Sequence, residues 1–67
     1  MEKIKVTGSL IELSTDDQLI TVDMKAIVRV QWNEIGSEIS LLGGDVIYVD
    51  QDYEDIVKAW EDYYAEN

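Results

Sequence analysis

The sequence contains no cysteine, no histidine and no proline, and each absence excludes a class of site. Without cysteine there is no disulfide framework and no thiol chemistry. Without histidine and cysteine the usual zinc ligands and the Ser-His-Asp and Cys-His nucleophile systems are missing. Without proline there is no rigid PxxP segment. We therefore expect a protein that is not an enzyme and that holds no metal and no cofactor.

Long apolar runs are also missing. No segment approaches the ~20 apolar residues of a transmembrane helix, and the opening residues MEKIKV show neither a long apolar segment nor a small-residue cleavage site. We expect a cytoplasmic protein, in a bacterium or a phage-infected host cell. The 46% hydrophobic content argues against disorder, and a chain of 67 residues is expected to form a single small domain, residues 1–67.

Positive charge is scarce. Lysine and arginine together number 5 against 15 acidic residues, which leaves a net charge of −10. Residues 45–67 account for −7 of this, because eight carboxylates there face only Lys58. A field of this sign repels nucleic acid and anionic membranes and attracts basic surfaces. We therefore expect a basic protein partner, no direct nucleic-acid binding and no membrane association.

Apolar and polar residues alternate in several short segments, the pattern of a half-buried strand. The clearest one covers residues 27–33, where Val28, Val30 and Trp32 share one face. The other predicted strands lie within residues 3–6, 10–13, 19–23, 38–42 and 45–49, and residues 23–26 are a short link with room for one helical turn. Gly43-Gly44 predicts a hairpin, because a type I′ turn needs a positive φ at both central positions.

The period changes to 3.6 after Val49. One stripe of apolar and aromatic residues then predicts an amphipathic helix from about Gln51 to about Ala65, with Asp50 or Asp52 capping its first turn. Tyr53, Ile56, Val57, Trp60 and Tyr64 form this stripe. Trp32 and Trp60 are both expected in the core. The predicted fold is α+β: an antiparallel meander of four to five strands with one C-terminal amphipathic helix packed on one face.

Residues 19–64 resemble the small flagellar and swarming motility protein family. The resemblance is carried by the segments ITVD (20–23), AIVRV (26–30), ISLLGG (39–44), YVD (48–50) and YEDIV (53–57). It implies a small non-enzymatic accessory protein and assigns no catalytic residue. In size and charge the chain is also similar to phage-encoded inhibitors of host defence.

Two groups of acidic residues invite a chemical interpretation. Asp50, Asp52 and Glu54 match positions 1, 3 and 5 of a calcium loop, but Asp55 stands where that loop requires glycine. The adjacent pairs Asp16-Asp17, Glu54-Asp55 and Glu61-Asp62 diverge on a strand or helix and indicate no acid-base dyad. A capped, solvated helix start explains the first group, and exposed turns and faces explain the second.

The acids of the helix are the predicted binding residues. On one helix face, neighbouring carboxylates lie about 5–6 Å apart, a spacing broadly similar to that of phosphates along a nucleic-acid strand. We expect a regulator or inhibitor that docks on a basic surface of its partner, in the manner of a phage-borne nucleic-acid mimic. The contact residues would be Asp52, Glu54, Asp55, Glu61 and Asp62. The simpler interpretation is that these acids only keep the protein soluble.

A second apolar sheet face leaves a further alternative open. Leu19, Leu42, Ile47 and Val49 either form an exposed patch, which favours a homodimer through the sheet, or are covered by the N-terminal strands as in a small barrel. The first case predicts a structural or assembly accessory protein, of motility or phage, that acts by homo-oligomerisation. Binding of a signalling nucleotide is a third hypothesis, limited by the few cations: Lys3, Lys5, Lys25, Arg29 and Lys58.

Overall fold

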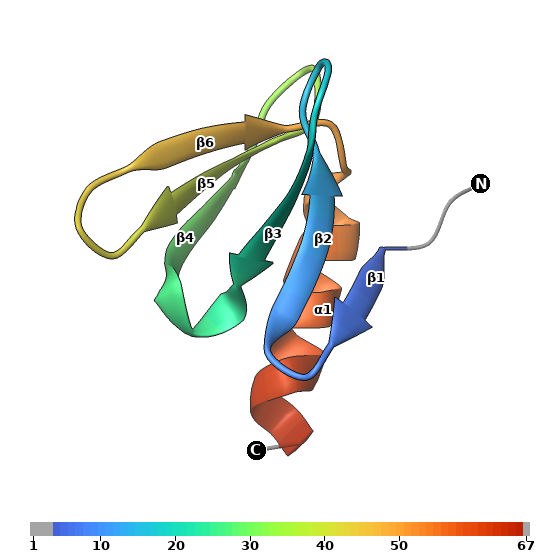
Figure 1. The fold of residues 1–67 in the computed structure, drawn as a ribbon, viewed down its shortest axis with the longest axis vertical. Coiled ribbons are helices and arrows are strands. Elements are labelled where there is room, and N and C mark those ends of the chain that lie inside the picture. Colours follow the sequence, from blue (N-terminus) through green and yellow to red (C-terminus); the bar gives the residue numbers. More distant parts are fainter. Residues whose placement is uncertain (1–3, 67) are drawn as a thin grey trace.

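Two three-stranded antiparallel sheets and one helix make up the described residues, 4–66, of the computed structural model (Figure 1). The first sheet has the order β1-β2-β3, and the second has the order β4-β5-β6. In chain order the elements are β1 Lys5–Thr7, β2 Leu10–Ser14, β3 Leu19–Asp23, the 3₁₀ turn η1 Met24–Ala26, β4 Ile27–Trp32, β5 Ser37–Leu41, β6 Val46–Val49 and α1 Tyr53–Glu66. The expected strand position of Lys3 lies outside the described residues.

The α+β class is confirmed, whereas the prediction of a single four-to-five-stranded meander is corrected by the turn between β3 and β4. The Asp23 carboxylate accepts a hydrogen bond from the Lys25 backbone N–H (3.0 Å), and the Ile27 N–H donates to the Met24 carbonyl. Met24 itself is fully buried. This capped and anchored 3₁₀ turn redirects the chain, so that β4 begins a second sheet instead of pairing with β3.

The first sheet shows the alternation of a half-buried antiparallel sheet. Its cross-strand register places Val6, Ile11 and Val22 in one row and Lys5, Glu12 and Thr21 in the next. Ile11 and Val22 are buried, whereas Lys5, Glu12 and Thr21 are exposed. The first sheet therefore has an apolar inner face and a mainly polar outer face, which also carries the exposed Leu10 and Leu19.

The second sheet follows the same rule, with one irregularity. Val30, Ile39 and Ile47 form an inward row, and Arg29 on the outer face lies 3.9 Å from the Glu38 carboxylate. The register shifts between Ile27 and Arg29, and the extra residue, Val28, is exposed. A bulge of this kind leaves one residue unpaired and re-aims the strand.

The core position predicted for Trp32 is wrong. The register places Trp32 in one row with Ser37 and Val49, both buried, yet Trp32 itself is 63% exposed. β4 is an edge strand of its sheet. The indole therefore lacks a neighbouring strand on one side. The sequence period predicts which sheet face carries Trp32, but it does not predict whether other residues pack over that side chain.

The predicted hairpin between β5 and β6 is present, with a loop one residue longer than a two-residue turn. The Leu41 N–H donates to the Asp45 carbonyl (2.8 Å), which leaves Leu42, Gly43 and Gly44 between them. The two glycines have φ of 93° and 98°. Both positive φ values agree with the prediction, because residues with a side chain adopt such φ values only with strain, whereas glycine adopts them freely.

Helix α1 joins both sheets in a single core. Its only fully buried side chain among the described residues, Ile56, belongs to one cluster with residues of β2, β3, η1, β4, β5 and β6, and α1 packs against β4. Trp60 packs on this cluster from the helix, as the 3.6-residue period predicts, whereas Tyr63 packs there in place of the predicted Tyr64, which is 53% exposed. The buried core residues are Ile11, Leu13, Val22, Met24, Ile27, Ile39, Val49 and Ile56.

The predicted exposed patch of four residues does not form, and the second apolar face is covered only in part. Val49 is buried and Ile47 half-buried, because the first sheet and the helix share their core. Leu19 and Leu42 remain exposed, at 74% and 66%. They lie at the start of β3 and in the β5–β6 loop, at separate places in the fold (Figure 1).

A polar network around Gln51 fixes the start of the helix to both sheets. The Ser14 backbone N–H donates to Gln51 Oε1 (3.0 Å), and Gln51 Nε2 donates to Ser14 Oγ (3.0 Å). The buried hydroxyl of Ser37 donates to the Gln51 carbonyl (2.8 Å), and the Asp50 N–H donates to the Ser14 carbonyl (2.8 Å). The end of β2, the start of β5 and the segment before α1 are thereby held together.

Candidate functional site

Four of the five predicted binding acids lie on helix α1, and Asp52 lies just before its first residue. Asp52, Glu54, Asp55, Glu61 and Asp62 are all exposed, while Ile56 on the opposite face is buried. The Asp52 carbonyl accepts the first helical hydrogen bond, from the Ile56 N–H (3.2 Å). The geometry needed for an acidic docking face is therefore present over the length of α1.

The arrangement of these acids follows from the helix period. At 100° per residue, Glu54 and Glu61 share one side of the outer face, and Asp55 and Asp62 share the other. Lys58 lies between the two pairs, and its Nζ is 3.6 Å from the Asp62 carboxylate. The lysine side chain is 78% exposed, so this ion pair is weak and easily screened. One base thus partly offsets four acids on the helix face.

The Asp50 carboxylate does not act at the helix start. It accepts a hydrogen bond from the Ser14 hydroxyl (3.1 Å), which places it between the end of β2 and the end of β6. Asp52 occupies the position before the first helical residue, Tyr53. Of the two residues predicted as caps, Asp52 is therefore the one in the capping position, and Asp50 belongs to a different part of the surface.

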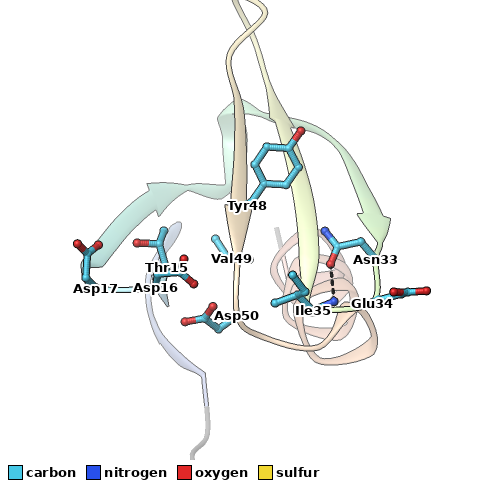
Figure 2. A pocket seen from close by; sticks show the side chains of 9 residues that line it. All are labelled: Thr15, Asp16, Asp17, Asn33, Glu34, Ile35, Tyr48, Val49 and Asp50. Atoms are coloured by element: carbon cyan, nitrogen blue, oxygen red, sulfur yellow. Dashed lines mark hydrogen bonds between the residues drawn. The ribbon is translucent and has the colours of Figure 1, made fainter.

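A second acidic feature is an open cleft at the end of the molecule where three loops meet (Figure 2). Its volume is about 660 Å³, and its walls are residues 15–17 after β2, residues 33–35 after β4 and residues 48–50 at the end of β6. We call this feature the loop cleft. Reasoning from the sequence missed it, because its walls come from three segments that are far apart in the chain.

The walls of the loop cleft are held by hydrogen bonds of backbone N–H groups to a side-chain oxygen and to a backbone carbonyl. Asn33 Oδ1 accepts from the N–H groups of Ile35 (2.9 Å) and Gly36 (2.8 Å), and the Thr15 N–H donates to the Gln18 carbonyl (2.8 Å). An Asx turn of this kind replaces backbone partners with a side-chain oxygen. The Asp16-Asp17 turn expected from the sequence is thus part of a cleft wall.

Charge and apolar surface are combined in the loop cleft. Asp16, Asp17, Glu34 and Asp50 are among its lining residues, and none of the described lining residues is basic. In Figure 2 the Asp50 carboxylate points toward Thr15 and Asp16, whereas Asp17 and Glu34 point outward at the two sides. The apolar part consists of Val49, Ile35, which is 82% exposed, and Tyr48, which is 63% exposed.

Metal binding receives no support from either acidic surface. Within residues 4–66 no three acidic side chains come close enough together to hold a metal ion. The segment that matched the first positions of a calcium loop ends in the helix, so that Glu54 and Asp55 stand on α1 and not in a loop. The carboxylates of both surfaces are spread along a rim or a face.

Over the same residues, no helix has both the length and the apolar character needed to cross a bilayer. The chain matches no family model, no curated protein and no solved structure. Its likeness to the small motility proteins and to phage inhibitors of host defence therefore stays a prediction, and its function has to be inferred from its own residues.

Proposed function

We propose that this chain is a small non-enzymatic protein-binding module, a regulator or inhibitor that docks on a basic surface of a partner protein. The observation that carries the proposal is the outer face of α1, where Glu54, Asp55, Glu61 and Asp62 are exposed around Lys58 alone. The opposite face is anchored in the core by Ile56. The acids are thus presented by a fixed element and need no ordering on binding.

The physical reason is long-range attraction followed by matching of charges. A net charge of −10 on 67 residues steers a cationic partner toward this protein over about one Debye length, ~8 Å at physiological salt. Carboxylates one helical turn apart, about 5–6 Å, then meet side chains that normally contact phosphates. A nucleic-acid-handling protein is the partner that this chemistry favours.

The test is affinity capture from bacterial lysate with a matched variant. The variant Glu54→Gln/Asp55→Asn/Glu61→Gln/Asp62→Asn keeps the size and the helical face but removes four charges. We expect the wild-type chain to enrich basic proteins at low salt, the variant to lose most of this enrichment, and 1 M salt to abolish it, because the Debye length then falls to about 3 Å. Enrichment that survives both changes would contradict the proposal.

A second candidate function has its own supporting observation. Trp32 and Val28 are 63% and 53% exposed on the edge strand β4, where a second copy could cover them. An exposed aromatic on an edge strand favours self-association, as in an assembly accessory protein. Light scattering across a hundredfold concentration range distinguishes the two: a dimer that Trp32→Ser dissociates would support this function, and a monomer throughout would exclude it.

A further inference from the structure

We propose that the loop cleft is a docking point for a single arginine side chain of the partner protein. This inference deepens the proposed function, on which it rests, by naming a second contact and its chemistry. The occupant would enter between the turn at residues 15–17 and the turn at residues 33–35, and its guanidinium would lie beside Tyr48 (Figure 2).

The charge of the loop cleft is complementary to a cation. Asp16 and Asp50 come from two neighbouring segments of the wall, with Asp17 and Glu34 at the outer sides, and the lining contains no lysine or arginine. On α1, by contrast, Lys58 already lies among the acids. A cation that approaches the loop cleft therefore meets no repelling group on its walls, whereas a phosphate or another anion would meet four carboxylates.

The same cleft also has exposed apolar surface. Ile35 is 82% exposed and Tyr48 is 63% exposed. Burial of such large apolar side chains against a ligand would be favourable, because it removes apolar surface from water. An arginine satisfies both parts of the site: its three methylenes pack on apolar surface while its planar guanidinium stacks on an aromatic ring and bonds carboxylates. Lysine has the same charge but lacks a planar group that can stack on the aromatic ring.

The walls of the loop cleft are held in place before any ligand binds. Asn33 Oδ1 holds the second turn through Ile35 and Gly36, and the Asp50 N–H is bonded to the Ser14 carbonyl. The Asp50 carboxylate is oriented by the Ser14 hydroxyl (3.1 Å). A preorganised site loses less conformational entropy on binding, which matters most for a ligand as small as one side chain.

The experiment uses the full chain labelled with ¹⁵N and two capped tripeptides, acetyl-Gly-Arg-Gly-amide and its citrulline analogue. Citrulline keeps the shape of arginine and removes the charge. We expect the arginine peptide to shift amide resonances in residues 15–17, 33–35 and 48–50, with millimolar affinity, and the citrulline peptide to shift none of them. Equal shifts with both peptides, or no shifts with arginine, would overturn the inference.

Two triple variants with equal charge changes show where the peptide binds. The variant Asp16→Asn/Asp17→Asn/Glu34→Gln alters exposed cleft residues, and Glu54→Gln/Asp55→Asn/Glu61→Gln alters the helix face by the same three charges. We expect the first to bind the arginine peptide about tenfold more weakly and the second to change it less than about twofold, as surface pairs of a few tenths to 1 kcal/mol each imply. Equal losses would show a diffuse charge effect and overturn the inference.

The single variant Tyr48→Leu gives an independent readout, because it removes the aromatic ring at a side chain that is 63% exposed. It should reduce the preference for arginine over the lysine peptide acetyl-Gly-Lys-Gly-amide, and an unchanged preference would count against stacking at Tyr48. The outcomes also separate this inference from the proposed function. If the helix variant loses capture but the arginine peptide does not bind the loop cleft, the proposed function stands and this inference is wrong. If the helix variant captures basic proteins as well as the wild type does, the proposed function itself is wrong.

Discussion

Replacing Gly36 with alanine is expected to destabilise this protein more than any other glycine substitution in the described chain. Gly36 is buried where the turn after β4 passes the end of β6. A Cβ at this position would collide with the Val49 carbonyl oxygen and lie 2.9 Å from both the carbon and the oxygen of the Asp50 carbonyl. All three are backbone atoms, so no side-chain rotation relieves the contact.

The magnitude follows from these distances. Favourable contacts of a carbon atom lie near 3.5 Å, so the Asp50 carbonyl would have to retreat by about 0.6 Å and the Val49 carbonyl by more. Overpacking of a core costs about 1–3 kcal/mol, and the absence of any flexible neighbour places Gly36→Ala at about 3 kcal/mol. A chain of this length has a total stability of roughly 3–10 kcal/mol, so a substantial unfolded fraction is expected.

The assay is urea unfolding followed by tryptophan fluorescence, with Gly8→Ala as the control. Gly8 has φ +62°, but a Cβ added there would meet no atom within 4 Å, so its substitution costs only the left-handed backbone, about 1 kcal/mol. For an m-value near 1 kcal/mol/M, Gly36→Ala should lower the midpoint by about 3 M and Gly8→Ala by about 1 M. A Gly36→Ala midpoint no lower than that of Gly8→Ala would refute the steric argument.

Three further substitutions test the core, the polar network and the helix face. Ile56→Ala removes a fully buried side chain shared by both sheets and should cost about 2–5 kcal/mol in urea unfolding; a loss below about 1 kcal/mol would show that α1 is not anchored there. Gln51→Ala leaves the Ser14 N–H and hydroxyl without their amide partner and should cost about 1–3 kcal/mol, and no change in the unfolding midpoint would argue against the network. Lys58→Gln removes the weak pair with Asp62, so the unfolding midpoint should hardly move, while capture of basic proteins at low salt should increase; weaker capture would contradict the role assigned to the helix face.

Local patterns predicted the elements well. The alternation at residues 27–33 and the period after Val49 anticipated β4 and α1, which the structure places at Ile27–Trp32 and Tyr53–Glu66. Periodicity succeeds here because a strand or a helix that buries one face must repeat its apolar residues at its own period. The positive φ at Gly43 and Gly44 was predictable for the same local reason.

Placement of elements relative to one another was not predictable. The apolar periods of β3 and β4 would be the same whether the two strands paired or belonged to separate sheets. The 3₁₀ turn at Met24–Ala26 redirects the chain and places them in separate sheets. Trp32 lies on the predicted face of its strand but is exposed, because β4 is an edge strand. The face of a residue is a local property, whereas its burial depends on what packs against that face.

The sequence by itself determined the charge, the helix with its acids outward and the absence of cysteine and histidine chemistry. Only the tertiary structure decided that residues 15–17, 33–35 and 48–50 meet in one cleft. The reason is physical: charge and periodicity are carried by neighbouring residues, but a cleft forms where distant segments are brought together by a shared core and by hydrogen bonds such as those of Gln51.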